Sequence, residues 1–190
     1  MRFRRCDGFT LVELLVVITL LSIVGVVIMP RVSGFLGADR GNMIALSSII
    51  TKTFDESFLR KKTCFLALHL NGPSAKPRED KNPVFERQNG VSVLILGENG
   101  SLEESKTRAL AFKKFPSGFT LDEVILSTGE RVTGGTVLIP FYPEGNSDDA
   151  IIHVTSGSDR FSVIIYKMRK EPRVTGEYID FDAVREGNVF

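Results

Sequence analysis

Residues 9–29 read FTLVELLVVITLLSIVGVVIM, and this stretch decides the architecture of the chain. Sixteen of its 21 residues are apolar, and Glu13 is its one ionisable side chain. A helix of this length spans roughly 30 Å, the thickness of the hydrocarbon core of a bilayer. A soluble helix is rarely apolar on all sides for so long, and an ordinary secretory signal has a shorter apolar run. The stretch therefore predicts a membrane-spanning helix.

The charges on either side of this stretch set its predicted orientation. Residues 1–8 carry Arg2, Arg4 and Arg5, and cationic residues beside a span stay in the cytoplasm. Arg31 and Arg40 follow the span, which weakens the asymmetry without reversing it. We therefore expect a single-pass protein whose N-terminus is cytoplasmic and whose large C-terminal part lies on the far side of the membrane.

Glu13 is unusual because an ionisable side chain inside a membrane helix costs about 2.5–3.5 kcal/mol. One interpretation is that Glu13 is protonated or reaches the nearby interface. The other requires cleavage before Phe9, which creates a cationic α-amino group about one helical turn away. The amine of a neighbouring subunit, shifted along the bundle, would then pair with the Glu13 carboxylate and set the stagger between subunits.

The segment Gly8–Ile18, GFTLVELLVVI, resembles the processing motif of type IV prepilins. The resemblance implies that residues 1–8 are a leader peptide and that prepilin peptidase cuts between Gly8 and Phe9. It also implies that the new N-terminal Phe9 is methylated and that Glu13 guides assembly with other pilins or pseudopilins through the N-terminal helix.

Residues 30–62 are predicted to continue this helix as a kinked, amphipathic stalk. Pro30 lies where many pilins have a helix-kinking proline, and its ring removes a backbone donor. Gly34 and Gly37 weaken the helix further. The alternative is that the helix ends at Pro30. After Ala38, an apolar residue recurs every four positions from Leu46 onward, with Met43 three positions before it. This pattern predicts the face that packs on a head: Met43, Leu46, Ile50, Phe54 and Phe58.

Residues 63–190 read as a β-rich globular head. Short runs rich in Val, Ile, Phe and Thr are separated by turn residues, which is typical of antiparallel sheets packed as a small sandwich. The predicted strands are Thr63–Leu70, Val91–Leu96, Phe119–Leu126, Thr136–Tyr142, Ala150–Thr155, Phe161–Met168 and Val174–Phe181. Together with the N-terminal helix they predict an α+β, pilin-like fold.

The head resembles the H-type minor pseudopilins of type II secretion and the related FimT-like minor pilins. The resemblance rests on the patterns of Phe141–Ser147, Ile151–Val154 and Phe161–Ile165. It implies a structural subunit of a periplasmic pseudopilus, anchored in the bacterial inner membrane, that helps move folded proteins across the outer membrane and contacts other pseudopilins and secreted proteins. The alternative is a minor pilin of a type IV pilus that binds DNA for uptake.

No catalytic motif is present in the sequence, so we expect neither an enzyme nor a cofactor. His69 and His153 each lie alone in a strand-like run, where a histidine is typically a surface or a satisfied core residue. Cys64 begins an apolar run and is expected to be a small buried hydrophobe. Asp148 and Asp149 follow a turn and offer oxygen ligands for calcium, but the EF-hand pattern is absent and we predict no metal site.

The chain as a whole is nearly neutral, with a formal net charge of +1, which argues against a general nucleic-acid binder. One local cluster of cations is the exception: Lys167, Arg169, Lys170 and Arg173. It is a candidate for contact with DNA phosphates, as the FimT-like resemblance allows. A solvated hairpin end is the more common role of such a cluster.

Overall fold

The computed structural model describes residues 11–20, 38–73 and 83–182. The chain divides into two compact units, Met1–Arg40 and Gly41–Phe190. Residues 1–10 and 21–37 lie outside the described residues. They include the predicted leader, Gly8, Phe9 and Pro30.

Residues 11–20 of the first unit form an α-helix in which every side chain is exposed. Its leucine, valine and isoleucine side chains range from 42% exposed at Val17 to 79% at Leu11. Among the described residues, no helix combines the length and the apolar character needed to cross a membrane. The predicted span, residues 9–29, is described only over residues 11–20 and stays a prediction.

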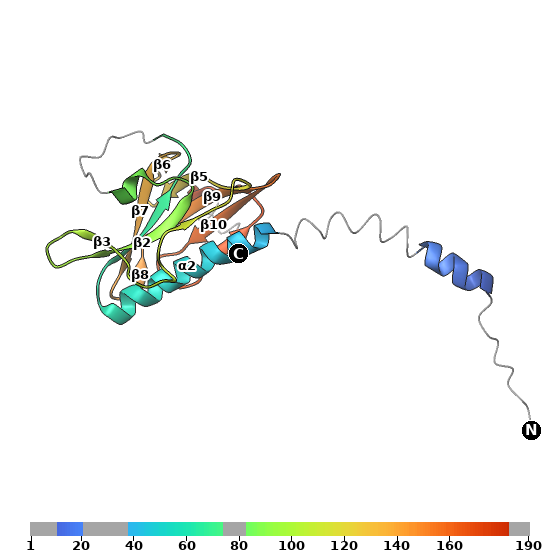
Figure 1. Ribbon diagram of the computed structural model, residues 1–190, viewed down its shortest axis with the longest axis horizontal. Helices are drawn as coiled ribbons and strands as arrows, with labels where there is room; N and C mark the ends of the chain where they lie inside the picture. Colours follow the sequence, from blue (N-terminus) through green and yellow to red (C-terminus); the bar gives the residue numbers. More distant parts are fainter. Residues whose placement is uncertain (1–10, 21–37, 74–82, 183–190) are drawn as a thin grey trace, which may run out of the picture. The chain divides into compact units, whose positions relative to one another are not determined.

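Helix α2 covers Ala38–Arg60 and packs one face on the head (Figure 1). Its buried positions follow the 3.6-residue period: Leu46, Ile49, Ile50, Thr53 and Ser57. The hydroxyl groups of Thr53 and Ser57 are buried at little cost in free energy, because each donates a hydrogen bond to a carbonyl oxygen of the preceding helical turn. Lys61, at φ 54°, follows the last helical residue in the left-handed conformation that terminates many helices.

The predicted apolar face of α2 is wrong at Phe58, which is 47% exposed. A strict four-residue repeat advances about 40° past a full turn at each step. Phe58 is therefore rotated by about 120° from Leu46, and Ser57 takes the buried position instead.

Six strands form the first sheet, in the order β3-β2-β1-β7-β8 with β4 also paired to β2. All of its pairs are antiparallel. The strands are β1 Cys64–His69, β2 Gly90–Leu96, β3 Leu102–Glu104, β4 Lys113–Lys114, β7 Thr136–Tyr142 and β8 Asn146–Ser147. A short 3-10 helix, Pro83–Glu86, packs Val84 on the outer face of this sheet.

Five strands form the second sheet, in the order β11-β10-β9-β5-β6, again all antiparallel. They are β5 Phe119–Leu126, β6 Arg131–Val132, β9 Ala150–Ser156, β10 Asp159–Ile165 and β11 Arg173–Thr175. Ile179, beyond β11, packs on the outer face of this sheet with Ile125, Ile151 and Ile164.

One hydrophobic core joins the inner faces of both sheets to α2. It includes Leu46 and Ile50 of the helix, Leu66 of the first sheet, and Leu121 and Ile152 of the second, each at most 1% exposed. Burying a side chain of this kind contributes about 1.5–3 kcal/mol, so this three-layer contact dominates the stability of the head. The predicted α+β fold, a helix packed on antiparallel sheets, is confirmed.

The seven predicted strands all exist, and the predicted bounds of β5 and β7 are those observed. The last strand is wrong in length, since β11 ends at Thr175 instead of continuing to Phe181. Beyond Thr175, the backbone forms hydrogen bonds with the side chain of Ser162 and not with a neighbouring strand. The Ser162 hydroxyl donates to the carbonyl of Glu177 and accepts from the amide of Ile179.

Candidate functional site

Glu13 lies in the exposed helix of residues 11–20, one residue from each of two exposed apolar side chains, Val12 and Leu14. Gly8 and Phe9, the predicted cleavage and methylation residues, and Pro30, the predicted kink, are outside the described part of the chain. The described helix therefore presents one carboxylate on a surface that is otherwise almost entirely apolar.

The predicted basic cluster lies in and after the connection between β10 and β11. Lys167, Arg169 and Lys170 are exposed, whereas Arg173 is half-buried in β11. Lys170 places its ammonium nitrogen 2.7 Å from a carboxylate oxygen of Asp55 on α2. Arg169 lies over the ring of Tyr166, 5.3 Å from its centroid. The structure thus brings the four residues to one region, with Lys170 already paired.

The acidic turn of Asp148 and Asp149 makes hydrogen bonds within the head. One Asp149 carboxylate oxygen accepts a hydrogen bond from the Lys167 amide at 2.6 Å, and Asp148 accepts one from the Tyr142 hydroxyl at 3.4 Å. Within the described residues, no group of three or more potential ligands of the His, Cys, Asp or Glu type is assembled for a metal ion.

His69 is a core residue with both ring nitrogens bonded. Its Nδ1 is 2.9 Å from the Thr136 hydroxyl and its Nε2 is 2.9 Å from the Ser92 hydroxyl. Burial, reinforced by the Arg87 charge, lowers the pKa of His69 from 6.5 to about 4. Cys64, also fully buried, has a thiol whose pKa burial raises to about 11. Neither side chain is placed for chemistry.

His153 is 5% exposed and its ring stacks on that of Tyr178, with centroids 4.0 Å apart. Its Nδ1 is 3.1 Å from the Ser162 hydroxyl. That hydroxyl has given its hydrogen to the carbonyl of Glu177 at 2.6 Å, so Nδ1 of the imidazole is the donor and Nε2 carries the lone pair. Burial lowers the pKa of His153, which keeps the ring neutral.

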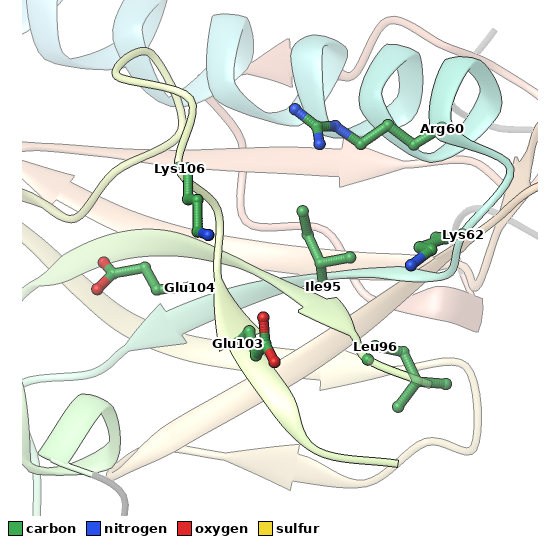
Figure 2. A pocket seen from close by; sticks show the side chains of 8 residues that line it. Arg60, Lys62, Ile95, Leu96, Glu103, Glu104 and Lys106 are labelled. Atoms are coloured by element: carbon green, nitrogen blue, oxygen red, sulfur yellow. The ribbon is translucent and has the colours of Figure 1, made fainter. Parts of the chain in front are cut away.

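A groove between the end of α2 and the β2–β3 hairpin is a feature that the sequence did not reveal. Its cavity has a volume of about 340 Å³ and is lined by Arg60, Lys62, Ile95, Leu96, Gly97, Glu103, Glu104 and Lys106. We call it the α2–β3 groove. Figure 2 shows Ile95 at its centre, Arg60 and Glu103 on opposite sides, and Lys106 and Lys62 at opposite ends.

The charges of the α2–β3 groove differ in how far they are neutralised. Glu104 is held by two hydrogen bonds from Arg87, at 2.7 and 3.0 Å, and its carboxylate points away from the groove in Figure 2. Arg60 pairs with Glu56 at 2.5 Å on its own helix. Lys62 is 3.7 Å from Glu98, whose side chain is 89% exposed, so this pair is screened by solvent.

Residues 3–29 match the family model of the prokaryotic N-terminal methylation motif. The chain is type IV prepilin-like. The matched residues contain Gly8, Phe9 and Glu13, and the motif implies processing by prepilin peptidase and assembly with other pilins or pseudopilins.

The head of this prepilin-like chain is similar to a solved structure, the minor pseudopilin EpsH from the type 2 secretion system of Vibrio cholerae. The TM-score is 0.50, the sequences are 9% identical, and the match covers 73% of this chain and 98% of that chain. At this identity the likeness shows a shared fold. No curated protein sequence matches the chain. The motif and the pilin-like fold together indicate a structural subunit of a type IV pilin-like system.

Proposed function

We propose that the prepilin-like chain is a minor pseudopilin of a type II secretion system, a structural subunit of the pseudopilus that helps move folded proteins across the outer membrane. The observation that carries a role in assembly is the helix of residues 11–20, whose apolar side chains are all exposed while the head buries a complete core of its own. Such a surface needs lipid or neighbouring subunits to cover it.

In this proposal the N-terminus supplies the assembly chemistry. Prepilin peptidase removes residues 1–8, and the methylated amine of Phe9 stays cationic. Before assembly, residues 9–29 anchor the subunit in the inner membrane, and its head lies in the periplasm. During assembly, Glu13 of one subunit pairs with the amine of another, which neutralises two charges in an apolar bundle and fixes the stagger of the subunits.

The choice of type II secretion over another pilin-like system is supported by the head, because the similar structure is that of a pseudopilin. The test is a deletion strain. We expect exoproteins to accumulate in the periplasm while surface pili remain intact, and wild-type protein to restore secretion. Normal secretion in the deletion strain, with the other pseudopilin genes present, would count against this role.

The second candidate is a minor pilin of a type IV pilus that binds DNA. The exposure of Lys167, Arg169 and Lys170 on one connection favours it. It predicts duplex-DNA binding that weakens steeply with salt and is lost when these residues and Arg173 are replaced by Ala. Loss of pili or of DNA uptake in the deletion strain, with secretion unchanged, would favour this candidate over the first.

A further inference from the structure

We propose that the outer face of the five-stranded sheet carries a saccharide-binding site, in which sugar hydroxyl groups bond to Nε2 of His153, to two carboxylates on β5 and to the guanidinium of Arg160. The site is a cavity of about 340 Å³, which we call the His153 cavity. Its lining includes Asp122, Glu123, His153, Thr155, Arg160 and Tyr178. The site lies wholly in the head, so it does not depend on which filament system the chain serves.

The buried side of the His153 cavity holds a ring nitrogen that lacks a partner. His153 is two positions beyond Ile151 in β9, so its side chain projects from the same, outer face of the sheet. It is 5% exposed, and among the described residues no group forms a hydrogen bond with its Nε2. Nδ1 donates to Ser162 of β10, so Nε2 faces the other neighbouring strand, β5, and is an acceptor. A ligand at this point must therefore donate a hydrogen bond.

A β-bulge brings two carboxylates to the β5 side of the cavity. The pairing of β5 with β9 shifts register between Leu121 and Glu123, so Asp122 is one extra residue in β5. A bulge redirects side chains, and Asp122 and Glu123 both line the cavity although they are adjacent. Asp122 accepts hydrogen bonds from the hydroxyls of Thr120 and Thr155, at 2.9 and 2.5 Å, and pairs with no cation among the described residues. Its oxygens keep lone pairs for further donors.

The β10 side of the cavity supplies hydrogen-bond donors. Arg160 is exposed, and within the described ranges nothing forms an ion pair or hydrogen bond with its guanidinium, which has five N–H groups. Arg160 pairs in register with Thr155 of β9, which pairs on its other side with Thr120 of β5. The cavity thus has acceptors on one side and donors on the other, with the width of β9 between them.

This arrangement suits neutral hydroxyl groups better than ions. An anion beside Arg160 would meet the carboxylates of Asp122 and Glu123. An ammonium group beside these carboxylates would meet Arg160, and also Arg131, which lies 3.5 Å from Glu123. A hydroxyl group can donate on one side and accept on the other, so neighbouring hydroxyls of a sugar can reach from the carboxylates of β5 to Arg160.

Tyr178 covers His153 and supplies apolar surface. Its ring stacks on the His153 ring with centroids 4.0 Å apart, yet Tyr178 is 56% exposed, which leaves ring surface for the C–H groups of a sugar. Its hydroxyl donates to Glu123 at 2.9 Å. Because Nε2 is itself buried, a ligand reaches it by displacing Tyr178, and a sugar hydroxyl then replaces Tyr178 as the donor to Glu123.

The test follows the two histidines of the chain by nitrogen-15 NMR. The full chain, labelled with nitrogen-15 histidine, is solubilised in dodecylphosphocholine, a detergent without a sugar head group. Trisaccharides of glucose, of galactose and of N-acetylglucosamine are added up to about 10 mM. We expect at least one of them to shift the Nε2 resonance of His153 in a saturable way. His69, whose ring nitrogens are both bonded, is the internal reference and should not shift.

Two variants test the polar sides of the cavity. Arg160→Ala and Asp122→Ala should each weaken sugar binding by about fivefold or more. The matched controls are Arg108→Ala and Asp159→Ala, because Arg108 and Asp159 are exposed and do not line the cavity. Both controls should bind as the wild-type chain does. Far-UV circular dichroism of each variant confirms that a loss of binding is not a loss of fold.

Four results would overturn the proposal. They are the absence of a His153 shift with all three sugars, equal shifts of His153 and His69, wild-type affinity in Arg160→Ala or Asp122→Ala, and tighter binding of inorganic phosphate or of N-acetyl-lysine amide than of any of the sugars. The first would mean that an internal water molecule satisfies Nε2.

Discussion

Asn89 donates a hydrogen bond from its side-chain nitrogen to the carbonyl oxygen of Phe119, 2.9 Å away. Its side-chain oxygen accepts from the amide of Leu121 at 3.3 Å. Asn89 directly precedes β2 of the six-stranded sheet, and Phe119 and Leu121 belong to β5 of the five-stranded sheet. A single amide group therefore ties the two sheets together at one end of the core.

Replacing Asn89 by Ala should lower the free energy of unfolding by about 2 kcal/mol, because it leaves buried backbone groups without partners. Asn89 also has a positive φ of 46°, which Asn tolerates better than Ala. The Asn89→Gly variant separates the two causes, since Gly accepts this φ but makes no side-chain bond. Thermal unfolding of the detergent-solubilised protein is the measurement. Wild-type stability in Asn89→Gly would contradict a role for the hydrogen bonds.

The ion pair of Arg87 and Glu104 predicts an acid-sensitive contribution to stability. The hydrogen bonds from Arg87 lower the pKa of Glu104, and the Phe112 amide adds a weaker contribution. A lowered carboxyl pKa stabilises the fold above its unfolded value of 4.5, and this contribution is lost as the pH falls through the folded value. Glu104→Gln should cost about 1 kcal/mol at neutral pH and less as the solution becomes acidic.

Denaturant unfolding of wild type and Glu104→Gln between neutral and acidic pH measures this difference. Glu103→Gln is the control, because Glu103 is the exposed neighbour on the same strand. If the gap between wild type and Glu104→Gln stayed constant down to strongly acidic pH, the ion pair would not be its source.

The lowered pKa of His69 predicts a second pH range in which the stability of the head changes. Because the pKa of His69 is about 4 in the folded state and 6.5 otherwise, the unfolded chain binds more protons between these values. Stability should therefore fall as the pH drops from about 6.5 toward 4. The ring nitrogens of His69, followed by nitrogen-15 NMR, should still show a neutral imidazole at pH values where an exposed histidine is charged. Titration of His69 with an ordinary midpoint would refute the buried, bonded geometry.

Gly134 predicts a steric effect. A β-carbon added there would lie on the carbonyl oxygen of Pro73 and 2.7 Å from the carbonyl carbon of Gly72, and both contacts are to backbone. Gly134→Ala should therefore destabilise the head by about 2 kcal/mol. Gly118→Ala is the matched control, since nothing lies within 4 Å of its β-carbon and its effect should be below about 0.5 kcal/mol. Equal melting temperatures for the two variants would disprove the close approach.

Replacing Glu13 by Val should impair assembly of the filament but not processing of the leader. The Glu13→Val protein should be cut and methylated at Phe9, as shown by mass spectrometry of the membrane-extracted chain, but its share in assembled filaments should fall about tenfold or more. Replacement of Gly8 by a bulkier residue is the complementary control and should block cleavage. Normal incorporation of Glu13→Val would remove the need for the ion pair, and intact Met1 in cells with active peptidase would refute processing itself.

The sequence by itself determined the features whose information is local. The apolar run after Gly8, with its single carboxylate at Glu13, identifies the prepilin-like N-terminus because the motif is contiguous. The strand-forming residues of Phe119–Leu126 and Thr136–Tyr142, set between turn residues, predicted the observed bounds of β5 and β7, because both signals are local in the sequence.

Only the tertiary structure decided the features whose residues are distant in the chain. β3, β4, β6 and β8 are two or three residues long, too short to show a period, and are strands only because a longer neighbour pairs with them. Ser57 is buried in place of Phe58 because the helix meets the head at one angle of rotation. The α2–β3 groove is lined by residues as distant in the chain as Arg60 and Lys106, and no local pattern encodes that approach.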